Sequence, residues 1–278
     1  MKITDIRAQW ESAAPGWARW EAFIATWVEP ATMEMLSMAG VDTGMRILDI
    51  ACGAGSQTLR AARRVGPQGH VLATDIAETM LWHVQENART AGLSNITTLA
   101  GAAEELNLAP GGFDAVICQM AMMHFPSPAK ALTVIRHALR PGGKVAILVF
   151  TTPDTNPFMV QPMQILLRHA GKTPPKPGLP GIFALGAPGT IENLFANNGF
   201  VNIVQHTLTL PFRIPTSKEA LMMIQEAFGA YRAVLSDCSE TVRKAAWFEV
   251  AQNLKTFETP TGFVAPAEVL VAAGVKPA

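Results

Sequence analysis

Hydrophobic and polar positions follow two alternating patterns along residues 46–150. Short apolar runs typical of buried strands cover residues 46–50, 70–75, 95–100, 113–119 and 144–150. Between them lie longer segments whose apolar residues recur at helical spacing, at 56–65, 78–92 and 127–139. Strands that alternate with helices of this length are joined by right-handed crossovers. The pattern therefore predicts an α/β fold with a parallel sheet and helices on both faces.

The chain changes character after Phe150. Proline-rich stretches surround one predicted helix at about 157–171, and we expect this region to fold over the sheet as an insertion. Regular structure then returns with a helix over 190–199, for which Thr190 is the expected N-cap. The insertion is thus expected to cover the sheet rather than to form a flexible linker.

The C-terminal part, from residue 200 on, is predicted to contain both strands and helices. A β-like stretch at 200–212 is expected to turn back on itself. Thr216 and Glu219 form a capping-box pair in front of one long helix that ends at about residue 235. A further helix is expected at about 239–257, and the chain ends in a strand.

Four tryptophans near the N-terminus have helical spacing. They are Trp10, Trp17, Trp20 and Trp27, separated by 7, 3 and 7 positions. Such a stripe could cover a binding site as a lid, or it could dock the helix on the core. The pattern does not choose between these two interpretations.

Composition places the chain among ordinary globular proteins and excludes several partners. Of its 278 residues 49% are hydrophobic and 16% are charged, and 22 basic residues balance 22 acidic ones. We therefore expect no nucleic-acid substrate and no membrane association, and a cytoplasmic location. The three cysteines are widely spaced and have no metal-ligand pattern, so neither a zinc site nor a disulfide is expected.

The stretch RILDIACGAGSQT at residues 46–58 indicates a ligand that lies against the main chain. Gly53 and Gly55 leave no Cβ between the backbone and such a ligand. A dinucleotide fingerprint needs a third glycine, where this chain has Thr58, and a P-loop needs a lysine after the glycines. These departures argue against a nicotinamide oxidoreductase and against a phosphate cradle.

Two carboxylates accompany this turn. Asp49 lies within the first strand, and Asp75 ends the second strand twenty residues after Gly55. Asp75 can accept hydrogen bonds from both hydroxyls of a ribose, and Asp49 can help to place an ammonium group. Carboxylates without a compensating Lys or Arg suit a cationic ligand with hydroxyl groups, such as S-adenosylmethionine.

The motifs LDIACGAGSQT, ATDIAETML, GAAEEL, FDAVICQMAMMHF and ALRPGGKVAILVF resemble those of class I S-adenosylmethionine-dependent methyltransferases, in particular the ubiquinone/menaquinone-biosynthesis type. The resemblance implies a Rossmann-like seven-stranded sheet in the order 3-2-1-4-5-7-6 with the last strand antiparallel. It also implies a single domain over 1–278. We expect a helical lid at 1–40, a cofactor-binding core at 41–150, and substrate caps at 151–190 and 215–260.

The resemblance also assigns cofactor-binding residues. It implies that the backbone of Ala51, Cys52, Gly53 and Gly55 surrounds the methionine part of S-adenosylmethionine, that Asp75 binds the ribose, and that Ile76 and Met80 face the adenine. Where the family has Asp or Asn at the adenine amino group, this chain has Ala102, which leaves the backbone of Ala103 or the side chain of Glu104 for that role. Gln119 and Met120 would lie near the sulfonium.

The expected reaction is methyl transfer to an oxygen or carbon of a small, apolar or aromatic acceptor. An acceptor that must lose a proton needs a base, and His124 after the fourth predicted strand is the candidate. The alternative for His124 is packing beside Phe125. A protein that binds S-adenosylmethionine without methyl transfer, as a regulator or as a rearrangement or cyclisation enzyme, also remains open, as does a homo-oligomer.

Overall fold

The computed structural model describes residues 3–174 and 179–278, and a seven-stranded sheet forms its centre. The strands are β1 (Arg46–Ile50), β2 (His70–Asp75), β3 (Ile96–Ala100), β4 (Phe113–Gln119), β5 (Leu139–Phe150), β6 (Val201–Thr209) and β10 (Glu268–Val275). Their order is β3-β2-β1-β4-β5-β10-β6. β10 runs antiparallel to both of its neighbours, whereas β1 to β5 pair in parallel. The predicted fold class and strand order are confirmed.

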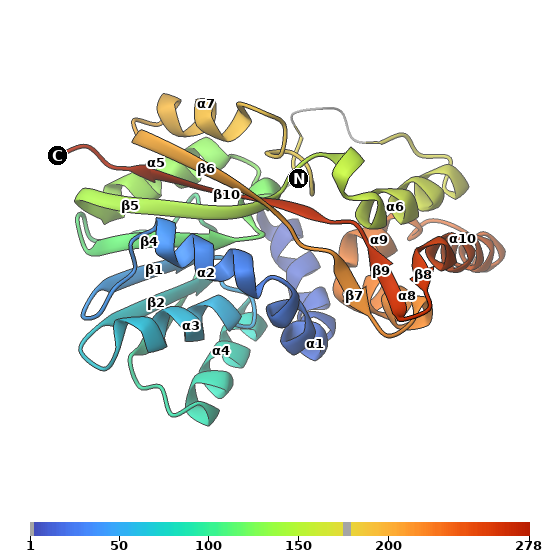
Figure 1. The fold of residues 1–278 in the computed structure, drawn as a ribbon, viewed down its shortest axis with the longest axis horizontal. Coiled ribbons are helices and arrows are strands. Elements are labelled where there is room, and N and C mark those ends of the chain that lie inside the picture. Colours follow the sequence, from blue (N-terminus) through green and yellow to red (C-terminus); the bar gives the residue numbers. More distant parts are fainter. Residues whose placement is uncertain (1–2, 175–178) are drawn as a thin grey trace.

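Helices cover both faces of the sheet (Figure 1). One face carries α2 (Glu29–Met38), α3 (Ser56–Val65) and α4 (Glu78–Thr90), and the other carries α5 (Pro128–Ala138) and α7 (Thr190–Asn197). The crossovers β1-α3-β2 and β4-α5-β5 move in opposite directions from the centre of the sheet, so a right-handed path places α3 and α5 on opposite faces. The change of direction between β1 and β4 is a topological switch point.

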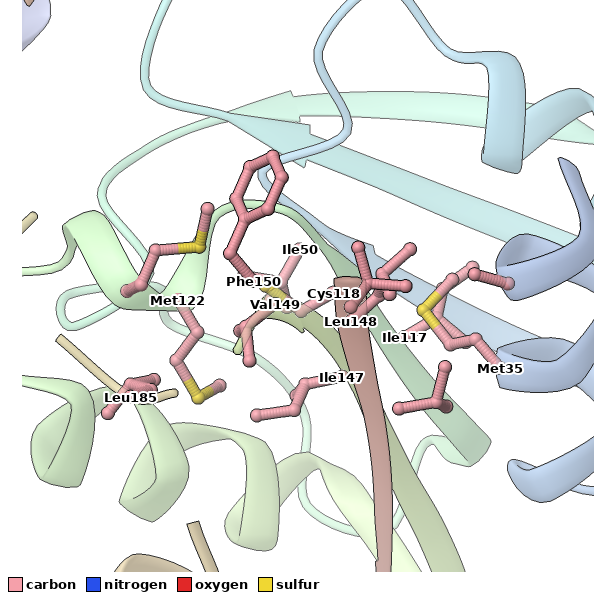
Figure 2. Close-up of a cluster of buried hydrophobic side chains, with 14 of the residues drawn as sticks. Met35, Ile50, Ile117, Cys118, Met122, Ile147, Leu148, Val149, Phe150 and Leu185 are labelled. Carbon is pink, nitrogen blue, oxygen red and sulfur yellow. The ribbon is translucent and has the colours of Figure 1, made fainter. Parts of the chain in front are cut away.

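The apolar core lies on both sides of the central strands. Figure 2 shows Ile117 of β4 near Met35 of α2, while Ile147 of β5 lies with Met122 and Leu185. All of these side chains are buried. The core thus continues up to the carboxyl ends of β4 and β5, where it supports the loop that follows β4.

A second group of elements lies at one end of the sheet (Figure 1). It contains the helices α6 (Pro157–His169), α8 (Ser217–Ala227), α9 (Gly229–Val234) and α10 (Glu240–Leu254), together with a small sheet of β7 (Phe212–Ile214), β8 (Glu258–Thr259) and β9 (Gly262–Ala265). The N-terminal helix α1 (Ile3–Trp27) lies between this group and α4. Short 3-10 helices occur at η1 (Met122–His124), η2 (Pro153–Thr155) and η3 (Lys255–Phe257).

Three local predictions are wrong. The stretch at 200–212 does not fold back on itself, because β7 leaves the large sheet and pairs with β9. The helix after Thr216 is interrupted at Phe228, which separates α8 from α9. Gly189, with φ of 76°, is the N-cap of α7, and Thr190 is already inside the helix.

Other local predictions are confirmed. The Thr216 hydroxyl accepts a hydrogen bond from the Glu219 amide at 3.2 Å, as expected for an N-cap. In the proline-rich stretch that follows α6, residues 175–178 lie outside the described part of the chain. Within residues 3–174 and 179–278, no helix combines the length and apolar character that a membrane span requires.

Candidate active site

A cleft opens at the carboxyl ends of β1, β2 and β4. It contains about 790 Å³ of empty space, part of it open to solvent. Its walls consist of Ile3, Ile6, Trp10, Trp17, Ala51, Gly53, Thr74, Asp75, Ile76, Met80, Gly101, Ala102, Ala103, Glu104, Gln119, Met120, Ala121, His124, Phe125 and Pro126. The cleft lies at the switch point of the sheet, where open α/β sheets bind their ligands.

The turn after β1 forms one wall of the cleft and has an unusual backbone. Ala51, Gly53 and Gly55 have positive φ angles of 54°, 56° and 97°. A Cβ on Gly55 would lie 3.0 Å from Cγ2 of Val84 in α4. Glycine at this position therefore allows both the left-handed backbone and the close approach of α4. Ala51 adopts the same region of φ at a cost in strain, and such strain is often found at binding sites.

Asp75 connects this turn to the end of β2. Its Oδ2 accepts a hydrogen bond from the Gly53 amide at 3.0 Å, and its Oδ1 accepts one from the Ala77 amide at 2.9 Å. Burial raises the pKa of Asp75 to about 6, although these amide bonds oppose the shift. A carboxylate oxygen accepts more than one hydrogen bond, so the side chain keeps acceptor capacity toward the cleft.

Asp49 lies beneath the turn and does not line the cleft. The hydroxyl of Thr58 donates to its Oδ2 at 2.5 Å, and the amide of Gln57 donates to its Oδ1 at 3.4 Å. Its side chain is fully buried, which raises its pKa to about 7, and the nearby charge of Asp75 acts in the same direction. Thr58, where a dinucleotide fingerprint has glycine, thus holds the carboxylate under the turn.

The end of β4 forms the opposite wall. Gln119 accepts a hydrogen bond from the Thr32 hydroxyl of α2 at 2.6 Å and donates to Gln57 at 3.4 Å. Met120, which follows it, has a φ of 53°, a strained value for a residue with a side chain. Like Ala51, Met120 lines the cleft, so both strained non-glycine positions of this region face the same space.

His124 ends the short helix η1 and faces the cleft. Its imidazole packs against the Trp10 ring of α1 at 5.9 Å with an angle of 68° between the planes. In the described part of the chain, neither ring nitrogen has a hydrogen-bond partner. Burial lowers the pKa of His124 to about 4, so the imidazole is neutral at pH 7 and has a lone pair to offer a proton donor.

The cleft brings together most of the predicted site residues. Those that line it are Ala51, Gly53, Asp75, Ile76, Met80, Ala103, Glu104, Gln119, Met120 and His124. The side chain of Glu104 also accepts a hydrogen bond from the Ser127 amide in front of α5, at 3.2 Å. Cys52 and Gly55 belong to the turn but, like Asp49, do not line the cleft, and Cys52 lies in a buried cluster with Ala73 and Leu81.

Sequence reasoning missed several residues that α1 and the β4–α5 loop contribute. Ile3 and Ile6 extend the apolar stripe of Trp10 and Trp17 into the cleft, and Phe125 and Pro126 face it as well. Ile3, Ile6, Trp10 and Trp17 are separated by 3, 4 and 7 positions, which is helical spacing. This pattern could have assigned the two isoleucines to the same face as the tryptophans.

The tryptophan stripe contacts both the cleft and the elements packed against α1. Trp10 and Trp17 line the cleft. Trp20 donates a hydrogen bond to Glu226 of α8 at 2.7 Å, and Trp27 donates to the carbonyl of Leu210 at 2.9 Å. One half of α1 thus lines the cleft while the other half docks on its neighbours.

The charge of the cleft matches a cationic, hydroxyl-bearing ligand. Asp75 and Glu104 line it, and among the described residues no Lys or Arg does. No cluster of His, Cys, Asp and Glu within residues 3–174 and 179–278 could hold a metal ion. The positive sulfonium and the ribose hydroxyls of S-adenosylmethionine fit this donor set better than a pyrophosphate would.

Comparison with known proteins places this site in a family. The model of the methyltransferase domain family matches residues 41–170. The chain is 31% identical over 211 residues to nocamycin O-methyltransferase of Saccharothrix syringae. This alignment covers 71% of this chain and 75% of that protein. It is 35% identical over 119 residues to the ubiquinone/menaquinone biosynthesis C-methyltransferase UbiE of Idiomarina loihiensis. That match covers 42% of this chain and spans about half the length of the relative, 47%.

A solved structure shows the same fold with a cofactor product. Phosphoethanolamine N-methyltransferase 2 of Haemonchus contortus, in complex with phosphomonomethylethanolamine and S-adenosylhomocysteine, superposes with a TM-score of 0.57 at 20% identity. The match covers 90% of this chain and 53% of that one. Together with the relative matched over three quarters of its length, these findings show that the chain belongs to the S-adenosylmethionine-dependent methyltransferases.

Proposed function

We propose that this enzyme transfers the methyl group of S-adenosylmethionine to an oxygen or carbon atom of a small, apolar or aromatic metabolite. The observation that carries the proposal is the mixed lining of the cleft. Asp75 and the glycine turn line it together with the apolar side chains of Ile3, Ile6 and Trp10. The Trp10 ring also packs against the neutral imidazole of His124. The names of the O- and C-methyltransferases among the relatives support this class of acceptor.

The cofactor end of the cleft has a defined set of donors and acceptors. The backbone from Ala51 to Gly55 would lie along the methionine part, and Asp75 would accept hydrogen bonds from the ribose hydroxyls. Ile76 and Met80 provide apolar contacts for the adenine, and the Ala103 backbone or the Glu104 carboxylate would bind its amino group. When bound, the cofactor supplies an electrophilic methyl group on a positively charged sulfur.

The protein then needs to align a nucleophile with this methyl group and to exclude water. The positive charge of the sulfonium disappears as the methyl group is transferred, so no oxyanion hole is required. Correct orientation of the two reactants alone can lower the barrier by roughly 7–11 kcal/mol. Gln119 and Met120 lie at the end of β4 beside the expected position of the sulfonium. The α1 side chains Trp10 and Trp17 cover the cleft and keep solvent away from it.

His124 would act on the acceptor. A pKa of about 4 makes the imidazole a weak base, but it is unprotonated at pH 7 and can accept a hydrogen bond from an acceptor hydroxyl. Full proton transfer is favourable only when the acceptor is itself acidic. Phenols, quinols and enols therefore suit this site better than aliphatic alcohols.

The decisive experiment is a methyl-transfer assay with a panel of phenols and quinols in which S-adenosylhomocysteine is detected. We expect turnover with apolar aromatic acceptors. His124→Gln should lower kcat by about 100-fold with little change in the KM for S-adenosylmethionine, because general-base assistance contributes to the chemical step. His137→Gln, at an exposed position of α5, is the matched control and should have wild-type kinetics.

Binding without transfer is the alternative outcome of this assay. Ala102 replaces the acid that the family uses at the adenine, and the fold alone does not choose the reaction. A protein that binds S-adenosylmethionine but forms no S-adenosylhomocysteine with any acceptor of the panel would favour a regulatory, rearrangement or cyclisation role. Equal kcat in His124→Gln and wild type would remove the proposed role of the imidazole.

A further inference from the structure

Glu21 of α1 lies at the N-terminus of α3, directly after the glycine turn. Its Oε1 accepts a hydrogen bond from the Ser56 amide at 3.0 Å. Ser56 is the first residue of α3, and the preceding Gly55 has no side chain that could cap the helix. A carboxylate from another helix therefore lies beside the turn whose backbone would surround the methionine part of the cofactor.

Glu21 has no cationic partner of its own within the described residues. Arg60 is the basic side chain that acts on it, but its guanidinium forms a salt bridge with Glu29 at 3.0 Å. Burial raises the pKa of Glu21, while hydrogen bonds from Ser56 and Trp17 oppose that shift. The charge of Glu21 in turn contributes to the raised pKa of Asp49. A positively charged group next to this carboxylate would stabilise the ionised form of Glu21.

Trp17 shows where a hydrogen-bond donor can sit between Glu21 and the turn. Its Nε1 lies 3.3 Å from the position that a Cβ on Gly53 would occupy, and Trp17 hydrogen-bonds Glu21. A polar N–H group is thus placed over the bare backbone of the turn and next to this carboxylate. An ammonium group that took the place of the indole N–H could donate to Glu21.

Asp49, the residue expected to place the ammonium group, is not in a position to do so. It is fully buried below the turn, and its two oxygens accept hydrogen bonds from Thr58 and Gln57, whereas Glu21 is partly exposed. The backbone amides of the turn and of α3 suit the carboxylate of the methionine part instead. The ammonium group therefore needs an acceptor from outside the core.

We propose that Glu21 is this acceptor: its carboxylate accepts a hydrogen bond from the α-ammonium group of S-adenosylmethionine. The inference rests on the cofactor placement proposed above and is independent of the acceptor's identity. It makes α1 part of the cofactor site, although this helix lies outside the matched family region at 41–170. Closure of α1 over the cleft and recognition of the amino-acid end of the cofactor then occur together.

Glu11 provides a matched control on the same helix. Its Oε1 accepts a hydrogen bond from the Glu78 amide at 2.6 Å, and its Oε2 accepts one from the Thr79 amide at 3.3 Å. It thus caps α4 as Glu21 caps α3, but at the adenine side of the cleft. Glu11→Gln perturbs the docking of α1 without touching the ammonium group.

The test compares two ligands by calorimetry at pH 7.5. One is S-adenosylhomocysteine and the other is its deamino analogue, which lacks the ammonium group. We expect Glu21→Gln to weaken binding of S-adenosylhomocysteine by about 10-fold or more and to leave binding of the deamino analogue within 2-fold, because one charge-assisted hydrogen bond is lost. Glu11→Gln should change the affinities for both ligands by the same factor.

Three outcomes would overturn the assignment. Equal weakening of both ligands in Glu21→Gln would mean that the residue only docks α1. Tighter binding of S-adenosylhomocysteine would mean that Glu21 competes with the ligand's carboxylate for the Ser56 amide. Unchanged affinity for both would mean that it contributes nothing. Failure of the cofactor placement itself is distinguishable, since Asp75→Asn would then leave both ligands bound at wild-type affinity.

Discussion

Single residues in the turn after β1 decide how closely the chain approaches a ligand and a neighbouring helix. Gly55 has a φ of 97°, and any Cβ there would meet the Val84 side chain at 3.0 Å. Gly44 has a comparable φ of 79°, but nothing lies within 4 Å of the position of its Cβ. An alanine at Gly44 therefore has only the energetic cost of a positive φ, whereas an alanine at Gly55 also has the cost of the contact with Val84.

Replacing each glycine by alanine should give different losses of stability. Gly44→Ala should lower the free energy of unfolding by about 1 kcal/mol, because a side chain disfavours positive φ. Gly55→Ala should cost about 1–3 kcal/mol more, because α4 must also shift to accommodate the methyl group. Urea denaturation of the two variants and the wild type measures both values. Equal losses of unfolding free energy in the two variants would show that the Val84 side chain moves aside without an energetic penalty.

At the scale of elements, the position of α1 depends on its contact with α8. Gly16 lies where the two helices touch, and a Cβ on it would be 1.9 Å from the backbone oxygen of Glu226. The Glu226 side chain also accepts hydrogen bonds from Trp20 and Arg19 of α1. A small residue and a short polar network thus hold the helix that covers the cleft.

Gly16→Ala should therefore release α1 from α8. Two backbones cannot approach when a methyl group lies between them, so we expect a loss of about 2 kcal/mol in unfolding free energy and weaker cofactor binding. Hydrogen exchange should increase along α1 while β1, β4 and β5 stay protected. Ser12→Ala, at an exposed position of the same helix, is the control and should leave the exchange of α1 unchanged. Uniformly faster exchange in the sheet would contradict this view of α1 as a separately docked element.

The elements also show where sequence reasoning succeeded and where it failed. The helices and strands of the core were predicted because their periodicity is strong and their ends carry glycine or proline. Thr190 was misassigned because a glycine in the left-handed region can cap a helix without a side chain. The break at Phe228 was missed although Gly229 follows it directly, because the sequence on both sides has helical spacing and an isolated glycine is tolerated within a helix.

At the scale of the whole molecule, buried carboxylates couple the pH to both stability and ligand binding. Burial raises the pKa of Asp49 to about 7 and that of Asp75 to about 6, well above the value of about 4 in an unfolded chain. At a pH between the unfolded and the folded pKa values, the folded protein binds more protons than the unfolded one. Its unfolding free energy should therefore fall as the pH rises from about 4 to 7 and change little above pH 8.

Cofactor binding should depend on pH in the opposite sense. A positive sulfonium favours ionised carboxylates, so binding releases protons, and the affinity for S-adenosylmethionine should rise on the order of 10-fold between pH 5.5 and 7.5. Calorimetry at pH 6.5 in two buffers with different ionisation enthalpies would measure the proton release directly. S-adenosylhomocysteine, which lacks the sulfonium charge, should show a smaller dependence. A pH-independent affinity for S-adenosylmethionine would contradict ionisation of these groups on binding.

The sequence by itself determined the order of helices and strands, the glycine turn and the carboxylate at the end of β2. These features are local, because periodicity, turn residues and strand ends are written in neighbouring positions. It also pointed to Asp49 and Asp75 as a pair. The strand order came from the resemblance of its motifs to a family.

Only the tertiary structure decided which side chains share the cleft. It placed Asp49 under the turn and Asp75 beside it, although both lie in strands and both are acidic. It also brought Glu21 next to Ser56, 35 positions along the chain, and divided the tryptophans of α1 between the site and the core. Such contacts depend on how a helix packs across a sheet, and the spacing of residues within one segment carries no record of that packing.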